Sequence, residues 1–140
     1  MSKTLLYRWF GFGRLPRAMM PILEKEGILL LEEGIGGSIT FRKFRAPGRR
    51  YGYRKNWFTG SVVVTELRFA GFAFRKPVIN VPLEGPYLDK LDCSLEKDHA
   101  VLRVAFDSSD FHEDWSGMIE LKFRTPMARQ FLERIEVSSR

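Results

Sequence analysis

Cysteine is almost absent from this chain, because Cys93 is the only one among 140 residues. A single cysteine cannot form an internal disulfide, and the sequence contains neither a Cys-x-x-Cys pair nor a zinc ligand set. No apolar run approaches the roughly 18 residues that cross a bilayer as a helix. Near the start, Arg8 and several glycines interrupt any signal-peptide core. We therefore expect a protein of the reducing cytoplasm.

Acidic residues are missing from residues 34–65, although the chain has 17 of them. Seven of the 23 lysines and arginines lie within that stretch, and the other 16 are balanced by the 17 acids, so the rest of the chain is nearly neutral. The net charge of +6 and the pI near 9.7 therefore come from one segment, and they favour an anionic partner. The seven cations are Arg42, Lys43, Arg45, Arg49, Arg50, Arg54 and Lys55.

Short β-prone segments dominate the middle of the chain. Alternation of apolar and polar residues is clearest at 119–123, and it is also present at 91–95 and 100–106. Glycine and proline breaks separate the other segments, and the pairs Gly36-Gly37 and Thr59-Gly60 are typical of tight turns. Gly71 interrupts a period of two, which is typical of a bulge or a turn inside a strand pair. The remaining strands are predicted at 28–35, 38–44, 51–58, 61–67, 67–74 and 78–83.

Two helices are predicted, one at each end. Residues 125–137 carry an apolar stripe of Met127, Phe131, Leu132 and Ile135, preceded by Thr125 as a cap and a proline at the first helical position. Residues 15–26 favour a short helix that ends at Gly27. We expect one domain over 1–140, with an extension at 1–26, strands at 27–124 and a helix at 125–137.

This order predicts a mainly β protein, an antiparallel bent sandwich or partly open barrel of about seven or eight strands that is closed by the C-terminal helix. The stretches GSVVVTELRF (60–69), VINVPL (78–83) and IELKFRTPMARQFLERI (119–135) resemble the bacterial pleckstrin-homology-like and GRAM-type domains. The resemblance covers about residues 27–137 and implies a non-enzymatic binding module. The basic segment departs from the spacing of phosphoinositide-binding members, so lipid specificity does not transfer.

The basic segment is the candidate binding site. Its cations fall on both sides of Pro47-Gly48, so a hairpin with its turn there would bring the two groups to one rim. Near an anionic leaflet, each cation contributes about 1 kcal/mol. The aromatic residues between them can enter a membrane interface or stack on nucleic-acid bases; they are Phe44, Tyr51, Tyr53 and Trp57. The alternative is a solvated strand pair whose charges discourage edge pairing.

The other motifs predict less. The acidic loop 107–115 gathers four carboxylates around His112, but its spacing fails the EF-hand pattern, and we expect an ordinary polar loop without metal. Gly11–Pro16 lacks the last glycine of a nucleotide-binding loop. Residues 34–38 could offer backbone N–H groups to an anion, yet a hairpin turn explains their glycines. His99 fits a turn, and the aromatic cluster at 5–12 fits either packing on the domain or contact with a partner.

We therefore expect no catalytic residue and no cofactor. The first hypothesis is a module that docks an anionic membrane lipid or an acidic protein segment through residues 42–55. The second is a small β-barrel protein that binds nucleic acid with the same residues, although no RNA-binding signature accompanies the charge. A cavity for a small ligand is disfavoured by the bulky apolar inward positions. An exposed strand beside the last helix could pair two copies, so a homo-oligomer stays open.

Overall fold

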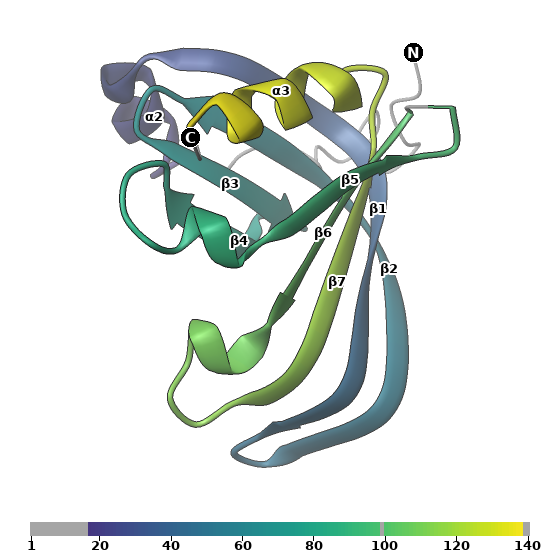
Figure 1. The fold of residues 1–140 in the computed structure, drawn as a ribbon. Coiled ribbons are helices and arrows are strands. Elements are labelled where there is room, and N and C mark those ends of the chain that lie inside the picture. Colours follow the sequence, from purple (N-terminus) through teal and green to yellow (C-terminus); the bar gives the residue numbers. More distant parts are fainter. Residues whose placement is uncertain (1–16, 99, 139–140) are drawn as a thin grey trace.

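A computed structural model describes residues 17–98 and 100–138, and it contains one antiparallel sheet of seven strands with a helix after the last strand. The strands run in the order β4-β3-β2-β1-β7-β6-β5. The first four strands thus form one meander and the last three another, and pairing between β1 and β7 joins them (Figure 1). The predicted fold class is confirmed: a mainly β, bent and partly open sheet with a C-terminal helix.

The elements differ greatly in length. Two strands are far longer than the others, while β5 has only five residues. Helix α2 begins with Pro21 in its first turn, where the missing N–H costs nothing, and it ends at Gly27 as predicted. The bounds are α2 Met20–Glu26, β1 Ile28–Ala46, β2 Arg49–Thr65, β3 Arg68–Ala73, β4 Lys76–Pro82, β5 Asp92–Glu96, β6 Val101–Asp107, β7 Ser116–Arg124 and α3 Ala128–Ser138.

The prediction of turns at Gly36-Gly37 and Thr59-Gly60 was wrong. Both pairs lie inside the continuous strands β1 and β2, where Gly36 pairs with Thr59 and Gly37 with Phe58. A Cβ on Gly37 would lie 2.5 Å from the carbonyl oxygen of Lys122 and 2.6 Å from the Phe58 ring. The glycine therefore serves close packing at the β1–β7 junction. The first hairpin turns only at Pro47-Gly48, where a break was predicted.

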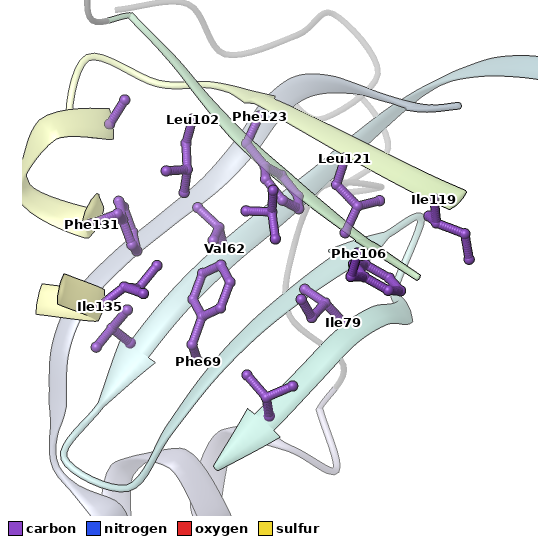
Figure 2. Packing of buried hydrophobic residues seen from close by; sticks show 14 of the residues in the cluster. Val62, Phe69, Ile79, Leu102, Phe106, Ile119, Leu121, Phe123, Phe131 and Ile135 are labelled. Carbon is purple, nitrogen blue, oxygen red and sulfur yellow. The ribbon is translucent and has the colours of Figure 1, made fainter. Parts of the chain in front are cut away.

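The main core fills the inside of the bent sheet, and α3 closes one end of it (Figure 2). Val62 and Phe69 from the first meander meet Leu102 and Phe123 from the second, and Phe131 of α3 packs beside them. Thr125 accepts a hydrogen bond from the backbone N–H of Met127 (3.0 Å) and so closes the turn that precedes α3, which begins at Ala128, three residues later than predicted. The apolar stripe of α3 therefore covers one end of the core.

A second, smaller cluster lies on the other side of β2 and β3. Leu23 of α2 packs there against Val63, Ala70 and Phe72. Because neighbouring residues of a strand point to opposite faces, the run Val62–Val64 needs apolar cover on both sides. Helix α2 supplies the outer cover and is held by Glu26, which accepts hydrogen bonds from Thr65 (2.8 Å) and Arg68 Nε (2.9 Å).

The two edges of the sheet are β4 and β5. The predicted bulge at Gly71 is confirmed by a register shift between Gly71 and Phe72. Prolines 77 and 82 remove backbone donors from β4, whereas β5 contains none. Among the described residues, no helix is long and apolar enough to cross a membrane.

Candidate binding surface on the first hairpin

The far end of the β1–β2 hairpin extends away from α3 and carries the predicted basic segment (Figure 1). Across the turn, Arg45 pairs with Arg50 and Ala46 pairs with Arg49. Residues 49–57 of β2 are exposed apart from the half-buried Tyr51. Residues on the two sides of Pro47-Gly48 are therefore neighbours, as the sequence predicted.

A bulge redirects the side chains near the tip. Between Arg42 and Arg45, β1 has one residue more than β7, and Lys43 adopts a positive φ of 50° there. A Cβ on Gly117 of β7 would collide with the Lys43 carbonyl, so this position also requires glycine. The extra residue turns Phe44 inward, where it is fully buried. The predicted interface residue Phe44 is therefore not on the surface, and its partner Tyr51 is half-buried.

Phe44 and Tyr51 form the inner aromatic end of the core. Their rings stack at 5.9 Å, and Phe44 meets the edge of Trp115 at 5.4 Å. Two of the predicted cations lie on this inner side: Arg49 above the Trp115 ring (5.4 Å) and Arg54 above Tyr51 (4.9 Å). The interpretation of Phe44 as a partner-contacting residue is corrected, because its side chain has no accessible surface.

The outer side of the hairpin carries the exposed rings. Tyr53 and Trp57 expose 64% and 61% of their surface, and Lys55 lies between them on the same face. The Lys55 Nζ atom is 4.4 Å from the centre of the Trp57 ring, and the Arg124 guanidinium approaches it at 5.4 Å. Arg42 lies 5.8 Å from the Tyr53 ring. Each exposed ring is thus accompanied by at least one cation.

Arg45 and Arg50 belong to the same outer side. Their pair adjoins the Phe44–Tyr51 pair, which packs against the core, and successive pairs of a hairpin point to opposite faces. We define the outer strip as these two arginines together with the rings and cations farther along the strands. Its members are Arg42, Arg45, Arg50, Tyr53, Lys55, Trp57 and Arg124.

Beyond the outer strip, the same face of the sheet is electrically balanced. Arg103 of β6 donates from Nε to Glu120 (2.6 Å) and from Nη1 to Asp92 (3.2 Å), and Lys122 pairs with Glu96 (2.9 Å). Burial disfavours the charged form of Glu120, but its hydrogen bond from Arg103 prevails and lowers its pKa below the usual value. The ion pairs neutralise β5–β7 and leave the positive excess on the hairpin.

Only one of the seven predicted cations has an acidic partner within the described part of the chain. Arg42 lies 3.4 Å from Glu120, whereas no carboxylate of the described residues lies within 4 Å of the other six. Arg42, Arg45, Arg50 and Lys55 lie on the outer side of the hairpin, Arg49 and Arg54 on the inner side, and Lys43 at the bulge. One rim therefore gathers four of them, together with Tyr53 and Trp57.

Three residues that contact the predicted cations and rings were not identified from the sequence. Arg124 lies far along the chain but reaches Trp57 across β1, where the small residues Gly36 and Ser38 leave room between β2 and β7. Trp115 and Glu120 also contact the predicted cations, Arg49 and Arg42. The alternation of residues 118–124 in the sequence indicates that Glu120 and Arg124 point outward. Their proximity to the hairpin follows only from the pairing of β7 with β1.

The acidic loop 107–115 lies beside the inner aromatic end. Asp107 accepts hydrogen bonds from the N–H (2.9 Å) and hydroxyl (2.7 Å) of Ser109, and these bonds lower its pKa. His112 stacks on Trp115 with ring centres 3.7 Å apart. Among the described residues no group of three metal-ligating side chains is found. The Gly11–Pro16 motif, the 5–12 cluster and His99 lie outside those residues.

A cleft of about 520 Å³ lies between α3 and β5, the strand at one edge of the sheet. Leu91, Leu95 and Leu132 line it together with Cys93. Burial, reinforced by the charges of Asp92 and Glu136, raises the pKa of the Cys93 thiol to about 12. The Cys93 thiol is therefore not activated as a nucleophile, and the predicted pairing of two copies along this edge stays a prediction.

Comparison with known proteins gives no relative: no family model, no curated protein and no solved structure matches the chain.

Proposed function

We propose that the protein is a non-enzymatic module that docks an anionic partner through the first hairpin. The observation that carries the proposal is the pair Arg45 and Arg50, which face each other at an exposed tip with no carboxylate of the described residues in ion-pair range. Like charges directly opposite each other destabilise a strand pair. A bound anion would relieve that repulsion, whereas a purely solubilising surface would not need to concentrate it.

The resemblance to pleckstrin-homology-like domains remains part of this proposal. A bent antiparallel sheet closed by a C-terminal helix agrees with it. The partner classes that follow from it are an anionic membrane lipid and an acidic protein segment. The lone cysteine fits a cytoplasmic location, which we also propose.

A charge-reversal experiment tests the proposal. The triple variant Arg45→Glu, Arg49→Glu, Arg50→Glu should elute from immobilised heparin at much lower salt than the wild type. The matched control, Lys76→Glu, Arg129→Glu, Arg134→Glu, changes the net charge equally but alters exposed residues of β4 and α3. Equal elution of the two triple variants would contradict docking through the hairpin, because only total charge would then matter.

Co-sedimentation with vesicles tests the membrane form of the proposal. Vesicles of phosphatidylcholine with phosphatidylserine should retain the wild type and the control triple variant more strongly than the hairpin triple variant. Phosphatidylcholine alone should retain none of them. Equal retention by neutral and acidic vesicles would exclude electrostatic docking on lipid.

A further inference from the structure

The outer strip alternates cations and flat rings along one strand. Tyr53, Lys55 and Trp57 occupy successive outward positions of β2, so they follow one another at about 6.7 Å, and the two rings are about 13 Å apart. Arg50, which pairs with Arg45, lies on the same outer side nearer the tip, about 23 Å from Trp57 along the strand. The outer strip is thus narrow and elongated along the strands.

The side chains of β1 that lie beside the outer strip do not cover its rings. Beside Trp57 and Lys55, β1 places Ser38 and Thr40, whose side chains are short. The Trp57 ring is therefore approached across β1 by Arg124 of β7, while more than half of its surface stays exposed. Exposed aromatic rings beside cations are the combination with which proteins bind single-stranded nucleic acid, whose bases stack on the rings and whose phosphates pair with the cations.

The combination of cations and aromatic rings in the outer strip favours one class of anionic partner over the others. An acidic peptide would pair with the cations but offers no regular series of flat groups to Tyr53 and Trp57. A bilayer is planar, whereas the β1–β2 hairpin is bowed along its length (Figure 1), so a flat surface does not follow the whole hairpin. A single-stranded nucleic acid is flexible, and it supplies phosphates for cations and bases for rings.

We propose that the outer strip binds single-stranded nucleic acid, with phosphates on Arg45, Arg50, Lys55 and Arg124 and bases stacked on Tyr53 and Trp57. The inference rests on the proposed anionic docking, but it places single-stranded nucleic acid ahead of the lipid and the acidic protein segment that the resemblance implies. Stacking on aromatic rings is tolerant of sequence, so binding is expected without strong sequence preference. Four phosphate contacts to a single strand predict a slope of about −3 for log K against log salt concentration.

Fluorescence anisotropy of labelled oligothymidylate, about 15 nucleotides long, tests the inference. The double variant Tyr53→Leu, Trp57→Leu keeps every charge and should bind at least tenfold more weakly. The ring-preserving double variant Tyr53→Phe, Trp57→Phe should bind within about twofold of the wild type. Tyr87→Leu removes an exposed ring outside the strip and should change nothing. Thermal melting verifies that each variant is folded.

Charge variants separate the inference from the proposal on which it rests. Arg50→Glu with Lys55→Glu should reduce the salt slope to about −1.5, because two of four phosphate contacts are lost. If the two leucines leave oligonucleotide affinity unchanged, or if only acidic vesicles bind, the nucleic-acid inference is overturned while anionic docking stands. If charge reversal in the hairpin alters binding to no polyanion, the proposed function itself fails.

Discussion

Arg45 and Arg50 lie directly opposite each other across the first hairpin, where the ladder places two like charges on the outer side of the sheet. Opposed like charges weaken a strand pair, and Thr has a high strand propensity. Arg50→Thr should therefore raise the free energy of unfolding by about 0.2–1 kcal/mol. The same change should lower the salt concentration at which the protein leaves heparin. Urea denaturation and heparin elution measure the two effects.

Arg49→Thr is the matched control for the expected gain of stability and loss of heparin binding in Arg50→Thr. Arg49 faces Ala46 and lies over Trp115, so its removal relieves no repulsion and loses a cation–π contact. The unfolding free energy should stay unchanged or fall slightly. If Arg50→Thr were destabilising while Arg49→Thr was neutral, the Arg45–Arg50 pair would be a stabilising feature, and the physical basis of the proposed function would be lost.

Acid should destabilise the protein through the carboxylates of Glu26, which is partly buried, and Glu120. Burial raises the pKa values of Glu26 and Glu120, but hydrogen bonds from Arg68 and Arg103 outweigh it and lower both below the usual value. A carboxylate with a depressed folded pKa adds stability above its unfolded pKa of about 4.3, and this is lost as the pH falls through the folded pKa. The free energy of unfolding should therefore decline from about pH 5 downward.

Glu120→Gln tests that assignment. The amide cannot titrate, so the variant should be less stable at neutral pH and should lose less stability on acidification than the wild type. Urea unfolding over a pH series measures both effects. An unchanged pH dependence would show that the Arg103–Glu120 pair does not contribute to acid sensitivity. Arg103 itself remains charged throughout, since its hydrogen bond to Glu120 raises its pKa further.

The β1–β7 junction should be sensitive to a single methyl group. Gly37→Ala would place a Cβ against the Lys122 carbonyl and the Phe58 ring, where neither backbone nor buried ring has space to move. Overpacking of this kind costs about 1–3 kcal/mol. Gly52→Ala is the control, because nothing lies within 4 Å of its Cβ and its φ is not positive. Chemical denaturation should show a loss for Gly37→Ala only, and equal effects would contradict the close packing described above.

The fold class was predictable because its signals are local. Residues 119–123 alternate strictly, and Thr125 and Pro126 lie just before α3, whose apolar stripe covers one end of the core. The long strands were not predictable. Gly36-Gly37 and Thr59-Gly60 have the composition of turns, and only the approach of β7 and the Phe58 ring explains why glycine lies in mid-strand. That approach is a tertiary contact without a local signature.

The candidate surface was predicted in location but not in composition. Counting charges located residues 42–55, and Pro47-Gly48 marked the turn. Strict alternation would have placed Phe44 with Arg42 on the outer face, but the bulge at Lys43 reverses the phase and buries it. Arg124 contacts Trp57 because β7 pairs with β1, although their paired residues are 71 to 86 positions apart in the sequence. Neither effect can be read from residue spacing.

Cys93 should be nearly inert toward thiol reagents in the folded protein. Its pKa of about 12 leaves roughly one thiolate in ten thousand at pH 8, whereas an unfolded cysteine with a pKa of about 8.5 is about one quarter ionised. Reaction with Ellman's reagent at pH 8 should therefore be about a thousandfold slower in the native state than in urea. Cys93→Ser with Ser116→Cys moves the thiol to an exposed position and should react rapidly without denaturant. Rapid reaction of the native wild type would mean that β5 opens readily from α3, since burial between them is the main cause of the raised pKa.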